Sequence, residues 1–337
     1  MNCKYFDEST YAKHISRYLG TDHNEIIVSI NDLIENINKI IDIYDEPFAD
    51  SSCLPTELIC KFASRDLKVI LSGDGGDEIF LGYNRYLFAK KIKSFHSYLP
   101  RSLRIMIQSI LNTFPSVFYD FISIPFQKSF GLQGFSHKVM KLSNILDYKD
   151  NNIFYKKLNI MDNNEIKNFS DNDPEYFQRY NELELIQSLQ CNDIEYYLPN
   201  DILTKVDRAS MFNSLEVRSP FLDHILVDKV SSFSVQTKMN NNSLKYLLKK
   251  ILSKYIPPKL FLRPKMGFAI PVDSWLKQKK MRAFCDDIFY NVNWELVGYE
   301  DKKIKNIWSN YKKYKNAPGA KIWLYLIAGL WVEKIKL

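Results

Sequence analysis

The chain has few of the residues that build metal and disulfide sites. Its 337 residues include five cysteines and five histidines. The cysteines form no Cys-x-x-Cys pair, and the histidines are too dispersed to form a spaced ligand set. This composition predicts neither a zinc site nor a disulfide framework, and it favours a reducing, cytoplasmic location.

A long apolar run and a concentrated basic block are also lacking. The most apolar stretch, residues 106–127, is interrupted by polar residues and prolines. We therefore expect buried helices there, in preference to a membrane-spanning helix or attachment to a membrane surface. The net charge of +7 comes from lysines scattered along the whole chain, which argues against nucleic-acid binding. The first 13 residues contain no apolar core of a signal peptide.

What the sequence does contain is an alternation of helix and strand patterns over residues 1–90. Apolar residues at helical spacing predict helices at 7–20, 31–46 and 54–65. A short strand is predicted at 24–30 and a buried strand at 67–73, followed by one helix at 77–93. Such alternation is typical of an α/β protein with a parallel sheet and covering helices.

The pattern becomes helical after residue 90. We expect a nucleotide-binding α/β part at 1–90, a helical segment at 91–190 and a mostly helical C-terminal part at 191–337, packed together as one unit. The proline-punctuated stretch 255–276 is expected to be extended or looped.

A glycine turn containing acidic residues follows the predicted strand at 67–73. Such a turn, at the carboxyl end of a parallel strand, is where open α/β sheets bind ligands, and glycine lets a ligand approach the backbone. The amides of Ser72 and Gly73 could contact a nucleotide. The carboxylates of Asp74 and Asp77 could hold Mg²⁺ or handle a proton on an amine nucleophile. Alternatively, Asp74 serves only the turn and Asp77 only caps the helix.

A second group of charged side chains occupies residues 197–223. One interpretation is a solvated helix with weak surface ion pairs. The other is a pocket-lining network, because apolar residues crowd Glu216 and Arg218, and this pattern predicts that both are partly buried. The charged residues of this segment are Asp201, Lys205, Asp207, Arg208, Glu216, Arg218 and Asp223.

A third segment, residues 263–275, contains Arg263 and Lys265 in a proline-restrained loop. Two cations two residues apart in an extended segment point the same way, as a phosphate clamp would require. Solvent-facing cations are the alternative.

Together these segments resemble the synthetase domain of the glutamine-dependent asparagine synthetases. The matching stretches are "LSGDGGDEIFLGY" (71–83), "DILTKVDRASMFNSLEVRSPFLD" (201–223) and "RPKMGFAIPVDSW" (263–275). Residues 7–26 and 44–52 are also similar to the family, so the resemblance covers nearly the whole chain in the family's order. It implies a partial parallel sheet of the ATP-pyrophosphatase (adenine nucleotide alpha hydrolase-like) type with a large helical remainder.

The resemblance implies ATP-dependent amidation of aspartate. ATP would adenylate the side-chain carboxylate, and ammonia would then attack β-aspartyl-AMP. By motif, Ser72 and Gly73 would contact ATP. Asp74, where many relatives have glutamate, would assist formation of the intermediate or deprotonate ammonia. Asp77 would help to bind Mg²⁺-pyrophosphate or the substrate amine, and Lys265 would offset phosphate charge. The residues implied to support the site are Asp207, Arg208, Arg218 and Arg263.

Two parts of the family pattern have no counterpart in this sequence. No Ser-Gly-Gly occurs, so the pyrophosphate loop "SGGxDSS" is absent, and we find no glutaminase domain; Cys3 is interpreted as an ordinary thiol. We therefore expect that the chain begins after the first strands of the sheet and is inactive alone. Ammonia would come from a glutaminase domain or chain elsewhere, with a complementing N-terminal polypeptide. The alternatives are a non-catalytic remnant or partner-binding subunit, and a family amidotransferase acting on another carboxylate.

Overall fold

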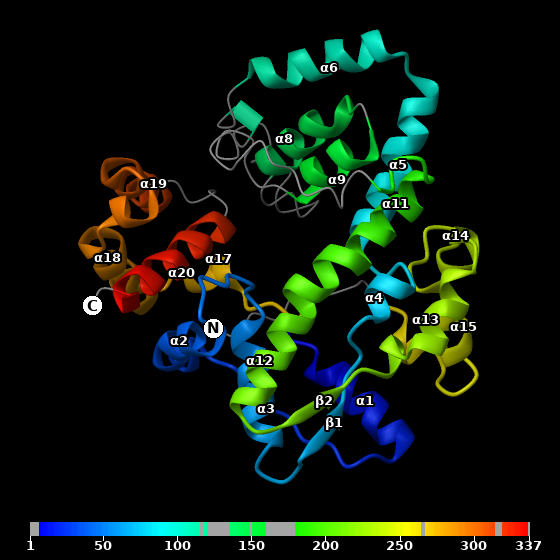
Figure 1. Cartoon of the computed structure of the whole chain (residues 1–337), viewed down its shortest axis with the longest axis horizontal. Coiled ribbons are helices and arrows are strands. Elements are labelled where there is room, and N and C mark those ends of the chain that lie inside the picture. The colour runs from blue at the N-terminus through cyan, green and yellow to red at the C-terminus, as the bar shows by residue number, and fades with distance from the viewer. Residues whose placement is uncertain are drawn as a thin grey trace. The chain divides into compact units, whose positions relative to one another are not determined.

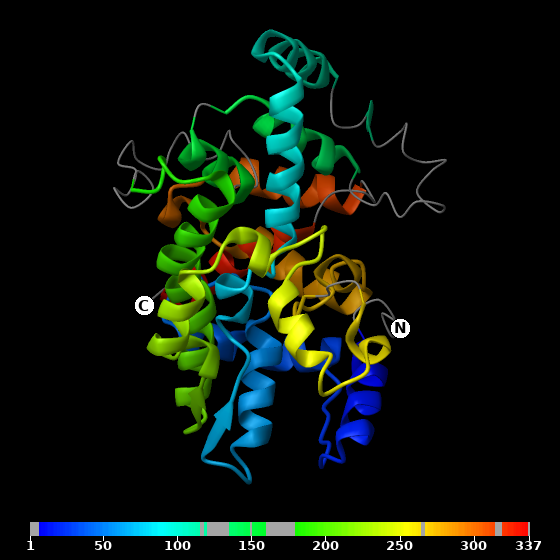
Figure 2. The same cartoon turned by 90° about the vertical axis from the view of Figure 1, so that its right-hand side faces the viewer.

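The computed structural model describes residues 7–114, 118–119, 135–148, 150–159, 179–263, 267–313 and 319–335. The chain divides into two compact units. Unit 1 comprises Met1–Gly73, Asp201–Pro220 and Lys249–Leu337, and unit 2 comprises Asp74–Asn200 and Phe221–Leu248. Helices dominate both units, and a small parallel sheet lies in unit 1 (Figures 1 and 2). The α/β prediction is confirmed at this level, whereas the division into three consecutive parts stays a prediction.

Three helices form the first part of unit 1, as predicted. Helix α1 (Ser9–Leu19) ends at Gly20, whose φ of 67° is left-handed and whose N–H donates to the carbonyl of Ser16. Helix α2 (Ile30–Tyr44) begins with a reciprocal capping box between Ser29 and Asp32. Helix α3 spans Cys53–Ala63. The predicted strand at 24–30 is wrong, because residues 24–29 join no ladder and Ile30 already belongs to α2.

The sheet of unit 1 has two strands in the described part of the chain. Strand β1 (Val69–Leu71) pairs in parallel with β2 (Glu216–Arg218), a strand that the sequence pattern did not predict. Helices α3 and α12 (Thr204–Phe212) contact each other, and α12 also contacts β2. Ile70 and Val217 pack with buried side chains of these helices, including Cys60 and Ala209.

The opposite face of β1 is exposed. Val69 and Leu71 flank Ile70, and the two residues are 43% and 71% exposed. The prediction that this strand is buried is therefore wrong. A strand is buried on both faces only where helices or strands cover both, and the described residues of unit 1 cover one face.

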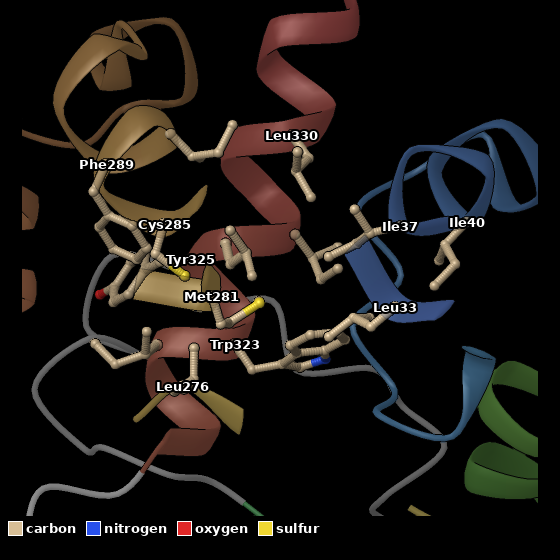
Figure 3. Close-up of a cluster of buried hydrophobic side chains, with 14 of the residues drawn as sticks. Leu33, Ile37, Ile40, Leu276, Met281, Cys285, Phe289, Trp323, Tyr325 and Leu330 are labelled. Atoms are coloured by element: carbon tan, nitrogen blue, oxygen red, sulfur yellow. The ribbon is translucent and has the colours of Figure 1, made fainter. Parts of the chain in front are cut away.

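The main core of unit 1 lies where α2 meets two carboxyl-terminal helices. Side chains from α2, α18 (Lys279–Asn291) and α20 (Gly319–Ile335) interlock there (Figure 3). Helix α19 (Asp301–Lys313) and the 3₁₀ turn Trp294–Val297 complete the cluster. Two short helices, α16 (Pro258–Phe261) and α17 (Val272–Trp275), interrupt the stretch expected to be looped.

Unit 2 begins with a helix that differs from the prediction. The expected helix at 77–93 is broken into α4 (Gly76–Ile79) and α5 (Asn84–Tyr98), and Leu81 between them has a left-handed φ of 54°. Most residues of the remaining elements belong to unit 2, and η3, η4 and α15 each include residues of unit 1. These elements are α6 (Arg101–Thr113), α8 (Phe135–Leu146), α9 (Asn151–Asn159), α11 (Leu185–Asn192), the π-helix η3 (Asp193–Leu203), the 3₁₀ helix η4 (Pro220–Leu222), α13 (His224–Ser231), α14 (Val235–Lys238) and α15 (Tyr246–Leu252).

The apolar stretch 106–127 is described only in part. Helix α6, which contains residues 106–113, buries none of its residues, so the prediction of a buried helix is wrong for this part. Residues 115–117 and 120–127 lie outside the described residues. None of the described helices has the length and apolar character needed to cross a lipid bilayer.

Candidate active site

The three matching stretches 71–83, 201–223 and 263–275 are called the signature segments below. Parts of the first two run side by side in unit 1. Beyond the β1–β2 ladder, the N–H of Ser72 donates to the carbonyl of Arg218 over 2.8 Å. The hydroxyl oxygens of Ser72 and Ser219 lie 2.9 Å apart. The Ser72 amide is thus used within the fold, which leaves the carbonyl or the hydroxyl as its means of contacting a ligand.

Gly73, the last residue of unit 1 before the turn, has an open side. A β-carbon built on Gly73 would meet no heavy atom of the described residues within 4 Å. The residue is also exposed. A ligand can therefore approach the backbone closely at this position, as the sequence interpretation requires.

The two glycines that follow have a packing role in unit 2. Gly75 is the N-cap of α4 with a left-handed φ of 81°, and a β-carbon there would overlap the Leu222 side chain, at 2.7 Å from Cγ. A β-carbon on Gly76 would lie 3.1 Å from a ring carbon of Phe221. These two glycines of the turn thus accommodate Phe221 and Leu222, near the end of the second segment. Close packing explains both of them without a phosphate.

The two acids of the turn lie in unit 2. Asp74 is partly buried, and Asp77 belongs to the first turn of α4. The Oδ1 atom of Asp77 is 3.1 Å from Nζ of Lys245, and about a third of each side chain is exposed. Gly82 makes this approach possible, because a β-carbon on Gly82 would lie 2.9 Å from Cγ of Asp77. Lys245 itself has a left-handed φ of 50°.

Sequence reasoning missed Lys245, because it lies outside the three quoted segments and 168 residues separate it from Asp77. Only the fold of unit 2 brings these two residues together. The described residues contain no group of three side chains of the kinds that hold a metal ion. The Asp77 carboxylate could contact a Mg²⁺ ion that phosphate oxygens also hold.

The first half of the second segment is tied to residues 44–52 within unit 1. Nζ of Lys205 lies 2.6 Å from Oδ2 of Asp50, and the Lys205 side chain is buried. Burial raises the pKa of Asp50, but the Lys205 ammonium and hydrogen bonds from Ser52 outweigh it and hold this pKa below 3.8. Arg208 donates to the carbonyl of Tyr44 and to Asp45, over 2.8 and 2.9 Å. The segment therefore serves at least partly as a structural network.

The second half of this segment is exposed. Arg218 Nε lies 2.8 Å from Oε1 of Glu216, and the two side chains are 64% and 51% exposed. The prediction that both are partly buried is wrong, because these alternate residues of β2 lie away from the face that α12 covers. Such a pair contributes at most ~1 kcal/mol. Asp207 is likewise exposed, on α12.

The third segment is described only at its start. Arg263 pairs with Glu8 over 2.7 Å, and its guanidinium lies 4.6 Å from the ring centroid of Tyr11. These contacts connect the segment to α1 within unit 1. Lys265 lies outside the described residues. The parallel orientation of the two cations stays a prediction.

A buried polar network in unit 2 supports the helix that carries Asp77. Gln190 donates through Nε2 to the carbonyls of Glu78 and Ile79, over 2.9 and 2.8 Å. Its Oε1 accepts from Nζ of Lys238 over 3.0 Å, and burial lowers the pKa of that lysine. No sequence signal marks this network, because Gln190 is more than one hundred residues from the helix that it holds.

Comparison with known proteins decides the family. The sequence profile described as asparagine synthase matches residues 1–333 of the chain. The chain belongs to the asparagine synthase family. Its resemblance to the synthetase domain is thereby confirmed.

Individual members of the family show how much of their length is matched. Asparagine synthetase (glutamine-hydrolyzing) 1 of Bacillus subtilis is 28% identical over 331 residues, which are 97% of this chain and 50% of that protein. A putative asparagine synthetase of Mycobacterium tuberculosis H37Rv is 26% identical over 282 residues, or 81% and 40% of the two chains. A putative asparagine synthetase 2 of Methanocaldococcus jannaschii is 40% identical over 101 residues, 30% of this chain and 19% of the other. The chain spans about half the length of the first of these relatives, or less of the others.

Proposed function

We propose that this chain is the synthetase portion of a glutamine-dependent asparagine synthetase. It would amidate aspartate at the expense of ATP, through β-aspartyl-AMP. The observation that carries this proposal is the parallel pairing of the first two signature segments, because the turn that begins at Ser72 follows the carboxyl end of β1. Ligand sites of parallel sheets lie at that end.

The backbone at the end of β1 would bind the nucleotide. Gly73 is open to solvent, and Ser72 retains its carbonyl oxygen after donating its amide to Arg218. Specific contacts here would orient the α-phosphate of ATP toward the aspartate carboxylate. Positioning of this kind is a large part of the catalysis of bimolecular reactions.

Asp74 and Asp77, which follow Gly73 in the chain, would interact with the amine and with the leaving group. Asp74 would take a proton from ammonia as it attacks the activated carboxyl carbon. Asp77 would contact the substrate amine or a Mg²⁺ ion held by pyrophosphate, and Lys245 beside it would balance charge within the pair. Lys265 would neutralise charge on the transferred and leaving phosphates. The supporting residues would be Asp207, Arg208, Arg218 and Arg263.

The proposed partners would provide the pyrophosphate loop and the glutaminase, for which we find no matching stretch in this sequence. No Ser-Gly-Gly stretch occurs in the chain, so a second polypeptide or further domain would provide the pyrophosphate loop and the glutaminase that releases ammonia. We propose that the chain alone is inactive and that it acts in the cytoplasm. Nucleic acid and membrane have no part in this function.

Asparagine formation from aspartate, ATP and glutamine tests the proposal. The protein to assay is a chimaera in which the half of the Bacillus subtilis relative that this chain does not match precedes the whole chain. We expect turnover, and we expect Asp74→Asn to lower it about 100-fold or more, because a general base is lost. Asp228→Asn, an exposed acid on α13, is the matched control and should leave turnover unchanged. A folded chimaera without turnover, or equal effects of the two variants, would refute the assignment.

A further inference from the structure

Three cations of unit 2 share one aspartate, Asp147, which directly follows α8. Arg101, the first residue of α6, donates to both of its carboxylate oxygens over 3.1–3.3 Å. Nη2 of Arg104, three residues further along α6, lies 3.5 Å from Oδ1. The ammonium of Lys157 on α9 donates to the backbone carbonyl of the same aspartate over 3.1 Å. Three cations against one carboxylate leave a local charge of +2.

Much of this cluster is shielded from solvent. The side chains of Arg104 and Asp147 are 12% and 14% exposed, whereas that of Arg101 is 61% exposed. Burial lowers the pKa of Lys157, and the charge of Asp147 acts in the opposite direction. Buried charges are screened less by water and salt than surface charges are, so the excess of cations raises the free energy of the folded chain. A bound anion would lower it.

Two buried nitrogen atoms in the same place have no hydrogen-bond partner among the described residues. They are Nε of Arg104 and Nε2 of His96, a residue of α5. Arg104 also donates to the backbone carbonyl of His96 over 3.4 Å, which brings the two residues together. The imidazole stacks on the ring of Tyr148 and bonds to the carbonyl of Leu146. Burial and the Arg104 charge lower the pKa of His96, while Asp147 acts in the opposite direction.

A purely structural role explains only part of the cluster. The Asp147 carboxylate connects the start of α6 to the end of α8, two helices that contact each other (Figure 1). One arginine is sufficient for this connection, and the second arginine and Lys157 add repulsion to it. A water molecule could satisfy the two nitrogen atoms, but it would supply no negative charge. An anion with several oxygen atoms meets both requirements.

We propose that this cationic cluster binds a dianionic phosphate group. The charge of the dianion equals the local excess, and guanidinium and ammonium groups are common phosphate ligands in proteins. Arg101 and Arg104 would donate to the phosphate oxygens, and Lys157 would act as a point charge beside them. The phosphate would be either the free ion or a phosphate monoester. The proposal does not rest on the proposed synthetase function, because none of these residues is assigned to that site.

Titration of inorganic phosphate into the whole chain, at constant ionic strength, tests the proposal by calorimetry. We expect saturable binding. Lys157→Gln should weaken it about tenfold or more, because a charge-assisted contact is lost. Lys91→Gln makes the same change of charge at an exposed residue of α5 and is the matched control. It should leave the affinity unchanged.

Asp147→Asn separates phosphate binding from a purely structural role. The substitution removes the competing carboxylate, so a folded variant should bind phosphate about fivefold more tightly or better. Phosphate should also raise the pKa of His96 in the unsubstituted chain, because an anion stabilises the imidazolium. The ring-proton shifts of His96 in NMR spectra measure this pKa. If Asp147 only connected two helices, its loss would reduce stability and bring no gain in affinity.

Two results would overturn the proposal. One is the absence of saturable phosphate binding by the folded chain. The other is equal weakening by Lys157→Gln and Lys91→Gln, since this would reveal a general attraction of anions to a chain with a net charge of +7. Glycerol 3-phosphate distinguishes the two sources: tighter binding than inorganic phosphate identifies a monoester, weaker binding identifies the free ion, and both uphold the site. Turnover is no part of the readout, so the outcome is independent of the proposed function.

Discussion

Leu222 occupies the space that a side chain on Gly75 would need. A β-carbon on Gly75 would lie 2.7 Å from Cγ of Leu222, and Gly75 has a left-handed φ of 81°. The first signature segment thus meets the end of the second through a contact that only glycine permits. Since Asp74 and Asp77 lie on either side of this glycine, the contact fixes the backbone that carries both acids of the proposed site.

Gly75→Ala is therefore expected to destabilise the protein strongly. The left-handed backbone costs an alanine ~1–2 kcal/mol, and the overlap with Leu222 adds about 1–3 kcal/mol. The free energy of unfolding in urea measures the sum.

Gly298→Ala is the matched control, because Gly298 has a similar φ of 77° but no described heavy atom within 4 Å of the added carbon. It should show the backbone cost alone. Equal losses for the two alanine variants would mean that Leu222 does not constrain the turn.

Gln190→Ala should also reduce stability, by about 3 kcal/mol. The change removes the donor of the carbonyls of Glu78 and Ile79 and the acceptor of the buried Lys238 ammonium. Buried polar groups left without partners cost ~1–3 kcal/mol each. Gln236→Ala, on the exposed side of α14, should change the unfolding free energy by less than about 0.5 kcal/mol. If both variants unfold alike, the network does not hold α4.

The pair of Asp50 and Lys205 predicts a specific loss of stability in acid. The pKa of Asp50 is below 3.8 in the folded chain, so the unfolded state binds more protons as the pH falls toward that value. The stabilisation by Asp50 is present above about pH 4 and is lost as the pH falls through the folded pKa. The pKa of Lys205 is raised above 10.5, so its own contribution is lost only at higher pH.

Urea unfolding of Asp50→Asn between neutral pH and acid pH checks this expectation. The variant should be less stable by about 3 kcal/mol at neutral pH, because a buried cation loses its partner. The difference should shrink as the pH falls below 3.8. In a Lys205→Met background, Asp50→Asn should lose most of this effect. A destabilisation that stayed constant from neutral pH into acid would contradict the pairing.

Sequence reasoning succeeded where the signals are local. Helices α1 and α2 follow from apolar periodicity, and their ends are set by Gly20 and by the capping box of Ser29 and Asp32. The turn after β1 was found for the same reason, since glycines and acids next to an apolar run are visible in a few residues.

The remaining features depend on residues far apart in the chain. Asp50 and Lys205 are 155 residues apart, and no local pattern in either segment predicts that the two side chains form a pair. The apolar pattern of β1 predicted burial on both faces, but exposure of Val69 and Leu71 depends on what packs against the strand. Residues 24–29 failed as a strand for a related reason, because a strand requires a hydrogen-bonded neighbour.

Aspartate-dependent exchange between ATP and pyrophosphate is the most direct test of the proposed function. It reports adenylation of aspartate without requiring ammonia or a glutaminase. We expect no exchange by the purified chain alone, because it contains no Ser-Gly-Gly loop to hold pyrophosphate, and clear exchange by the chimaera that supplies one. Robust exchange by the chain alone, or none by a folded chimaera, would contradict the assignment of this chain as the incomplete half of an asparagine synthetase.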